Sequence, residues 1–255
     1  MTAPPKESRN VFDGIAEDYE RAMQRSCSVS GEMPQFYAKE RMRWCAQRLI
    51  KTAPVGTVLD FGCGVGGSFR YFFEILGCHR LIGVDTSEES LRVARSRHSD
   101  LTLELSTPLA AAPGGDVDFA FCNGVFHHIP PVERGDALRY IRDSMRDGAV
   151  FAFWENNPWN PVVRYSMSIT EFDHDALTIS PSAARRMLKH AGFRVLTVDF
   201  RFFFPRFASW LRFLEPALRW CPLGAQYLVL AQKPVPGNGR PQQPTAIARG
   251  LPSPR

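Results

Sequence analysis

The stretch from Val58 to Gly67, which reads VLDFGCGVGG, joins a short apolar run to a glycine-rich loop and then to a helix-like segment. The apolar run predicts a buried strand. Glycine lets the backbone turn tightly and approach a ligand closely, while the start of a helix offers unpaired N–H groups. A second apolar run, Leu81–Val84, ends at Asp85. An acidic residue at this place commonly accepts hydrogen bonds from ribose hydroxyls, so the two runs together predict a nucleoside ligand.

The glycine spacing alone fits more than one nucleoside cofactor. Gly62, Gly64 and Gly67 satisfy the G-x-G-x-x-G pattern of dinucleotide sites, so an NAD(P)-dependent oxidoreductase is an alternative. Asp60 argues against it, because a carboxylate would repel a pyrophosphate and attract an ammonium or sulfonium group. Val58–Gly66 resembles the apolar-apolar-Asp/Glu-x-Gly-x-Gly-x-Gly signature of class I S-adenosylmethionine-dependent methyltransferases at every fixed position. The resemblance covers about residues 11–233.

The resemblance implies S-adenosyl-L-methionine as the cofactor and a set of residues that bind it. Those residues are Asp60, Gly62, Gly64 and Asp85, supported by Tyr19, Ser87 and Asn123. Tyr19 ends the segment Phe12–Tyr19, which resembles the Phe-Asp-x-x-Ala-x-x-Tyr motif of ubiquinone and menaquinone biosynthetic methyltransferases, where the tyrosine helps to close over the cofactor. The third predicted strand departs from the family, because Ser106-Thr107 stands where an aspartate usually contacts adenine. A hydroxyl could replace that contact, or Glu104 could shift in.

Strand-like and helix-like segments alternate along the chain, a pattern typical of a parallel sheet covered on both faces. The expected strands are 57–61, 81–85, 101–105, 118–123, 149–154, 193–204 and 226–232. The expected helical segments are 11–20, 37–51, 86–97 with a Thr86/Glu89 capping box, 138–147 stopped by Gly148, 180–191 stopped by Gly192, and 207–220. We predict a single Rossmann-like, doubly wound α/β domain with a mostly parallel seven-stranded sheet. The last two strands resemble the antiparallel edge hairpin of the methyltransferase sheet.

Polar side chains that follow the fourth and fifth strands are candidates for catalysis, because ligands bind beyond the carboxyl ends of parallel strands. Asn123 is followed by Gly-Val-Phe and then by His127 and His128. Adjacent histidines do not both face one side, so one of them, His128 or His127, is our first choice of general base, and Glu155 is the second. The alternatives are that these histidines are structural and that Glu155 pairs with Arg164.

The acceptor is expected to be a small molecule methylated on oxygen. Methylation at carbon or nitrogen of a natural-product, quinone or glycan precursor is an alternative. A non-catalytic protein that binds S-adenosylmethionine is another. The sequence leaves the identity of the acceptor and the oligomeric state open.

The net charge of +5 comes mainly from the two ends of the chain, since residues 234–255 carry three arginines and no acid. The near-neutral body argues against a nucleic-acid partner. Residues 1–10 and 234–255 are expected to be disordered tails around a methyltransferase domain at 11–233. The six cysteines lack a Cys-x-x-Cys pair, and together with the absence of an export signal this favours reduced thiols in a cytoplasmic protein. We expect no metal site, although Asp173–Asp175 has a metal-like composition.

The segment 202–220 is unusually aromatic and basic. Phe207, Trp210, Leu211, Leu214 and Leu218 fall on one helical face. The favoured interpretation is that this face packs on the sheet, and contact with a membrane or a lipid-carried substrate is the alternative.

Overall fold

The computed structural model describes residues 27, 29–49, 55–168 and 176–236. Tyr19 and the predicted helical segment around it lie outside these residues, as do the two predicted tails up to residue 10 and beyond 236 and the Asp173–Asp175 cluster. Within the described ranges, every helix is too short or too polar to span a bilayer.

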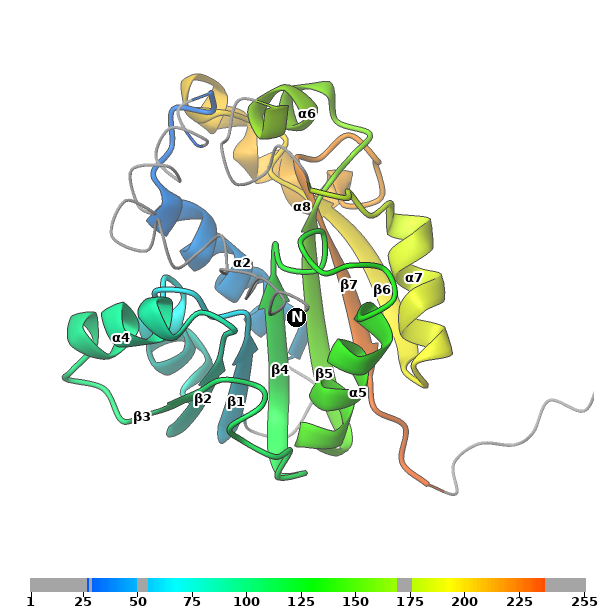
Figure 1. Ribbon diagram of the computed structural model, residues 1–255. Helices are drawn as coiled ribbons and strands as arrows, with labels where there is room; N and C mark the ends of the chain where they lie inside the picture. The colour runs from blue at the N-terminus through cyan, green and yellow to red at the C-terminus, as the bar shows by residue number, and fades with distance from the viewer. Residues whose placement is uncertain (1–26, 28, 50–54, 169–175, 237–255) are drawn as a thin grey trace, which may run out of the picture.

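The described chain forms one seven-stranded sheet with the order β3-β2-β1-β4-β5-β7-β6 (Figure 1). The strands are β1 (Thr57–Phe61), β2 (Arg80–Val84), β3 (Leu103–Ser106), β4 (Val117–Asn123), β5 (Met145–Asn156), β6 (Arg194–Arg201) and β7 (Gln226–Gln232). Strands β1 to β5 pair in parallel, whereas β7 runs antiparallel to both β5 and β6. The predicted Rossmann-like α/β fold with its antiparallel hairpin at the edge is therefore confirmed.

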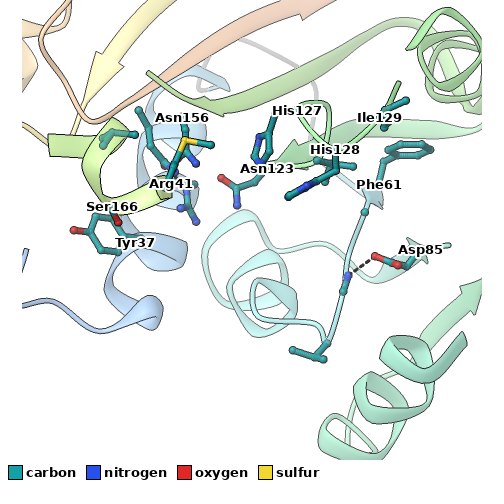
Figure 2. A pocket seen from close by; sticks show the side chains of 18 of the residues that line it. Tyr37, Arg41, Phe61, Asp85, Asn123, His127, His128, Ile129, Asn156 and Ser166 are labelled. Atoms are coloured by element: carbon teal, nitrogen blue, oxygen red, sulfur yellow. Dashed lines mark hydrogen bonds between the residues drawn. The ribbon is translucent and has the colours of Figure 1, made fainter. Parts of the chain in front are cut away.

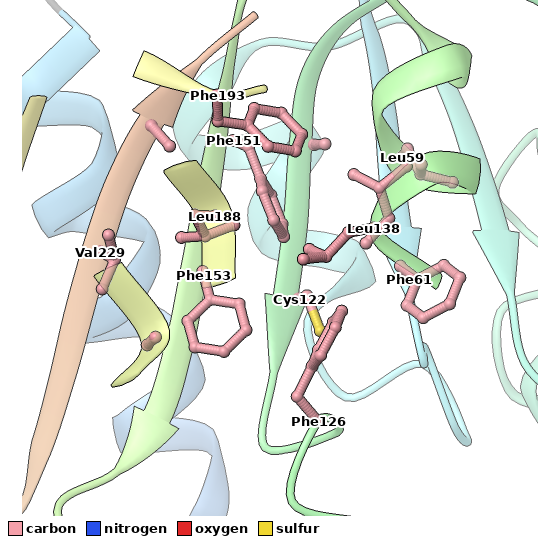
Figure 3. Packing of buried hydrophobic residues seen from close by; sticks show 14 of the residues in the cluster. Leu59, Phe61, Cys122, Phe126, Leu138, Phe151, Phe153, Leu188, Phe193 and Val229 are labelled. Carbon is pink, nitrogen blue, oxygen red and sulfur yellow. The ribbon is translucent and has the colours of Figure 1, made fainter. Parts of the chain in front are cut away.

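Helices cover both faces of this sheet. They are α2 (Pro34–Leu49), α3 (Phe69–Tyr71) with the π-helical turn η2 (Phe72–Leu76), α4 (Glu88–Arg97), α5 (Arg134–Ser144), α6 (Pro161–Ser168), α7 (Pro181–His190), the 3-10 segment η4 (Arg206–Leu214) and α8 (Glu215–Leu218). Alternate residues of each strand point to opposite faces and build two cores. Leu59, Phe151 and Phe153 pack with Leu138 of α5 and Leu188 of α7 on one face (Figure 3).

The second core lies on the other face and holds the opposite set of alternating strand residues. Val58, Phe121 and Trp154 pack there with Met42 of α2 and Phe72 of η2. Because both faces are covered, the strands read as continuous apolar runs, which is why the sequence revealed them.

Three predicted boundaries are wrong for local reasons. The N-cap of α4 is Ser87 and not Thr86, since the Ser87 hydroxyl accepts from the Ser90 N–H. Helix α5 ends at Ser144, and Gly148 lies inside β5, which begins four residues earlier than predicted, at Met145. Helix α6, in the stretch after Glu155, was not predicted.

The aromatic segment also differs from its prediction. Residues 206–214 form a 3-10 helix with a kink at Ala208, and no residue in it is buried. The expectation that its apolar face packs on the sheet is wrong.

Candidate functional site

A cavity of the described chain opens at the carboxyl ends of β1 and β4. At this point the strand order reverses, because the chain runs from β1 outward to β2 and β3 and then returns to β4 on the other side. Two neighbouring loops leave in opposite directions at such a switch point, and the space between them is the usual ligand crevice of an open α/β sheet. The cavity has a volume of about 420 Å³. Figure 2 shows its side chains converging from several elements.

The glycine loop after β1 forms one wall of this pocket. Gly62 has φ 73°, and a side chain there would lie 2.3 Å from Val125, so only glycine fits. Gly64 has φ 51° with nothing within 4 Å of the position a Cβ would take, which leaves its backbone open to a ligand. Both predicted glycines line the pocket.

Asp85 joins the glycine loop to the end of β2. One carboxylate oxygen accepts the Gly64 N–H at 2.8 Å (Figure 2). The other accepts the Ser87 N–H at 2.9 Å. Asp85 also lines the pocket. Each carboxylate oxygen has two lone pairs, so Asp85 can hold the loop and still accept a hydroxyl hydrogen bond.

Two predicted cofactor residues lie behind the pocket wall. Asp60 is buried and absent from the lining, and burial together with the nearby Asp85 charge raises its pKa to about 8. At neutral pH this carboxyl group is therefore mostly protonated in the ligand-free protein, which weakens the argument that its charge attracts a cation. Ser87 is fully buried and caps α4.

Asn123, at the end of β4, lies in the pocket (Figure 2). Its Oδ1 atom is buried and has no hydrogen-bond partner in the described part of the chain. An amide oxygen in this state costs free energy unless a ligand donates to it. The residue thus fits the ammonium group of an amino-acid ligand, a donor with three N–H bonds.

Two of the three predicted catalytic residues, His127 and Glu155, form one buried pair. The Nδ1 atom of His127 lies 2.5 Å from Oε2 of Glu155, and Oε1 of Glu155 accepts the Phe126 N–H at 2.9 Å. With the carboxylate as acceptor, Nδ1 is the donor of this hydrogen bond, and a neutral His127 ring would then carry its lone pair on Nε2. His127 lines the pocket, whereas Glu155 stands behind it. The alternative pairing of Glu155 with Arg164 is wrong.

His128 lines the same pocket as His127 (Figure 2), so the expectation that adjacent histidines do not both face one side is wrong. The two ring centroids are 4.1 Å apart with the planes tilted by 53°. Among the described contacts, the carboxylate of Glu155 reaches only the first of the two rings. His127 is therefore the ring whose orientation Glu155 holds.

The opposite end of the pocket contains a positive charge that the sequence did not indicate. Arg41 of α2 is buried, and its Nε donates to Gln226 Oε1 at 2.8 Å, while Gln226 Nε2 donates to Asn156 Oδ1 at 3.0 Å. All three residues line the pocket, and Arg41 lies near Tyr37 and Asn156 in Figure 2. One sequence signal could have pointed to Arg41. It lies four residues after Tyr37, and this spacing places both side chains on one face of a helix.

The third strand brings neither proposed adenine contact into the pocket. Glu104 is bound on the outside of the sheet by Arg80, with N–O distances of 2.7 and 2.9 Å, so it does not shift in. Ser106 and Thr107 are absent from the lining, and Pro108 is the lining residue at this end.

Comparison with known proteins agrees with this geometry. Residues 58–148 match a family model described as a methyltransferase domain. Trans-aconitate 2-methyltransferase of Azoarcus sp. (strain BH72) is 34% identical over 119 residues, which cover 46% of each chain. The described chain thus spans less than half the length of the curated relatives that it matches.

Solved structures extend the likeness to the whole fold. The methyltransferase in a complex with the Haloferax volcanii Trm112 methyltransferase activator superposes with a TM-score of 0.60 at 21% identity, covering 90% of this chain and 100% of that one. A SAM-dependent methyltransferase from Archaeoglobus fulgidus gives 0.57 at 18% identity, with 76% and 94% covered. Residues 58–148, which include the glycine loop, are thus similar to a methyltransferase domain, and the described chain shares the fold of solved S-adenosylmethionine-dependent methyltransferases.

Proposed function

We propose that this protein transfers a methyl group from S-adenosyl-L-methionine to a small-molecule acceptor, and that the methylated atom is an oxygen. The proposal depends above all on His127, which a buried carboxylate orients in the same pocket as the glycine loop and Asp85. The proposed base, His127, and the proposed cofactor site therefore share one pocket.

The residues of the pocket fit the cofactor from end to end. Asp85 would accept ribose hydroxyls, the open backbone at Gly64 would approach the ligand closely, and the unpaired Oδ1 of Asn123 would accept from the ammonium group. Once bound, S-adenosylmethionine supplies an electrophilic methyl group on a sulfonium. Asp60, buried behind the loop and close to Asp85, remains a proposed cofactor residue.

His127 would act as the general base. Its Nε2 lone pair accepts the proton of an acceptor hydroxyl, and the Glu155 carboxylate stabilises the imidazolium that forms at Nδ1. The remaining contribution is positioning, because methyl transfer is an in-line displacement that needs the two reactants held in line. A carboxylate acceptor needs no base, and His127 would then orient it by a hydrogen bond.

Arg41 supports an acceptor with an acidic group. The Arg41 guanidinium is buried in the pocket lining, and a guanidinium can bind a carboxylate through two parallel hydrogen bonds. The relatives' name specifies trans-aconitate, a tricarboxylic acid, which has this chemistry. The carboxylate of the cofactor's amino-acid end is a second candidate for the same cation.

The first experiment separates binding from turnover. Titration calorimetry with S-adenosylhomocysteine should give heat with wild-type protein and none with Gly62→Ala, whose added Cβ would meet Val125. NADPH serves as the control ligand, and heat from NADPH alone would favour an oxidoreductase.

The second experiment identifies the acceptor. Isotopic methyl from labelled cofactor is followed into a panel of di- and tricarboxylic acids, hydroxy acids, phenols and amines. Stable product at oxygen supports the proposal, and product at carbon or nitrogen selects the alternative chemistry. Cofactor binding without transfer to any acceptor in the panel or in cell extract would favour a non-catalytic binding protein.

The Arg41→Met variant distinguishes the two candidate partners of Arg41, the carboxylate of the acceptor and the carboxylate of the cofactor. A raised KM for the acceptor with unchanged cofactor affinity assigns Arg41 to the acceptor. Weakened binding of S-adenosylhomocysteine assigns it to the cofactor instead.

A further inference from the structure

An exposed aromatic surface lies beside the pocket and has no role in the proposed reaction. We call it the aromatic ridge and define it by Phe207, Trp210, Phe213, Trp220 and Leu223. The side chains of Phe207, Trp210 and Phe213 are 86%, 72% and 73% exposed, and Trp220 and Leu223 are exposed as well. Single exposed apolar residues are ordinary, but these five all fall between residues 207 and 223, and a concentration of this kind indicates a contact surface.

The local backbone explains why these rings point outward. In a 3-10 helix residues three apart lie directly above one another, so Trp210 and Phe213 project from the same side of η4. The segment is fastened from below by Glu215, which is buried and accepts the Phe202 and Phe203 N–H groups. Arg201 pairs with the same carboxylate at 3.4 Å. Polar anchors therefore hold the segment while its aromatic side stays in solvent.

The charge of the ridge is positive. Arg206 and Arg219 form no ion pair within the described part of the chain, and Arg219 lies 4.3 Å from the centre of the Trp220 ring. The only acidic residue between 202 and 223 is Glu215, whose carboxylate is turned inward. Aromatic rings flanked by arginines, with no exposed acid, match the interface of an anionic bilayer, where rings sit at the headgroup level and arginines meet phosphates.

The ridge adjoins the edge of the pocket. The Asn160 side chain donates to the Leu223 carbonyl at 2.7 Å, which ties the start of α6 to the ridge. Val162 of α6 is both exposed and part of the pocket lining, and Tyr165 beside it is exposed. On the other side, the Arg206 N–H donates to the carbonyl of Ser30, another lining residue. Figure 1 shows α6 and the gold ribbon of η4 at the same end of the molecule.

We propose that the aromatic ridge docks this protein on an anionic lipid surface, with the α6 side of the pocket turned toward the lipid. The site is distinct from the catalytic groups, so it can be tested whether or not methyl transfer has been observed.

Co-sedimentation with vesicles tests the proposal. Full-length wild-type protein should pellet with phosphatidylcholine vesicles containing phosphatidylglycerol, pellet less at high salt, and stay in solution with phosphatidylcholine alone. Trp210→Ser combined with Phe213→Ser should abolish pelleting. Arg206→Gln combined with Arg219→Gln should lower the partition coefficient on the order of tenfold, because each arginine near an anionic surface contributes separately.

Leu109→Ser is the matched control, since Leu109 is a fully exposed apolar residue in the loop between β3 and β4. It should pellet as wild type does. Thermal unfolding and calorimetry with S-adenosylhomocysteine check that each variant is folded with its cofactor site intact.

Three results would overturn the proposal. The first is no pelleting of folded wild-type protein with anionic vesicles, and the second is equal pelleting of the wild type and the Trp210/Phe213 variant. The third is a concentration-dependent dimer in sedimentation velocity that the same variant abolishes without any vesicle binding, which would assign the ridge to a second copy of this chain. Loss of methyl transfer with retained pelleting would count against the proposed function alone.

Discussion

The Glu155 carboxylate holds the imidazole of His127. Replacing each residue in turn therefore measures what it contributes to kcat. We expect His127→Ala to lower kcat by about 10²–10⁴-fold, the usual range for a general base, while the affinity for S-adenosylhomocysteine stays nearly unchanged. Glu155→Gln keeps the shape but removes the charge that stabilises the imidazolium, so we expect a smaller loss of kcat and a changed pH profile. Steady-state kinetics across pH with an identified acceptor provide the measurement.

His128→Ala is the control for this pair. His128 shares the pocket wall but is not oriented by Glu155, so its replacement should affect KM more than kcat. If His128→Ala were inactive and His127→Ala fully active, the assignment of the base would be reversed.

Asp60 gives a pH-dependent prediction about stability. Its pKa rises from 3.8 to about 8 on folding because of burial and the Asp85 charge. Between these two values the folded protein binds more protons at this site than the unfolded chain does, so this group makes the free energy of unfolding fall as pH rises from about 4 to about 8. Below about pH 4 Asp60 is protonated in both the folded and the unfolded protein, so it has no effect on the pH dependence. Above about pH 8 it is ionised in both, and the free energy of unfolding stays lowered by the cost of the buried charge.

Asp60→Asn removes this dependence while keeping the size of the side chain. Urea unfolding at about pH 5 and about pH 8 should show that the variant loses less stability than wild type between the two conditions. Parallel losses in the two proteins would mean that Asp60 is ionised throughout the range.

The sequence alone identified those residues of the pocket that belong to a short motif with fixed spacing. Gly62, Gly64 and Asp85 could be placed in the pocket because tight turns and close approach require glycine, and the expected ribose contact requires an acid, at fixed spacing. Asp60 was placed on the correct strand, but its spacing could not show that it lies behind the loop with a raised pKa. Arg41 was missed because it reaches the pocket from a helix before the sheet, and a tertiary contact of that kind leaves little local pattern.

At the scale of elements, the turn between β6 and η4 combines an unusual backbone conformation with a buried charge. Phe202 has φ 64°, in the left-handed region that non-glycine residues seldom adopt, and its N–H donates to Glu215. We expect Glu215→Ala to destabilise the protein by about 3–5 kcal/mol, because Arg201 would remain buried without its carboxylate. Chemical denaturation monitored by far-UV circular dichroism provides the value.

Glu88→Ala is the comparison for this prediction. Glu88 also begins a helix, but it forms no salt bridge among the described residues, so its loss should matter little. A change of less than about 1 kcal/mol in Glu215→Ala would show that the turn does not depend on this carboxylate.

Strands β1, β4 and β7 were predictable to within a few residues because each buries both faces and therefore appears as a short apolar run. Thr57–Phe61 and Gln226–Gln232 were placed with correct bounds. The segment 206–214 was not predictable in this way, since apolar spacing suggests a buried helical face and carries no information on what covers it. The same ambiguity hid α6, whose short apolar run follows a loop rich in asparagine and proline.

At the scale of the whole molecule, ligand binding should stabilise the described domain as a unit, since one sheet carries the residues at both ends of the pocket. A hundredfold excess of S-adenosylhomocysteine over its Kd should raise the free energy of unfolding by about 2.7 kcal/mol. Differential scanning calorimetry across a ligand series should show a single transition moving to higher temperature. A second transition that does not move would indicate a part of the chain that is thermodynamically separate.

The order of strands also has a consequence for synthesis on the ribosome. Strand β7 is the last strand of the described chain, yet it lies between β5 and β6 rather than at the edge. While the chain is being made, β6 emerges before the strand that separates it from β5, so both wait with unpaired edges. A nascent chain arrested before Gln226 should therefore remain open to proteases, and translation through Gln232 would let the interior close.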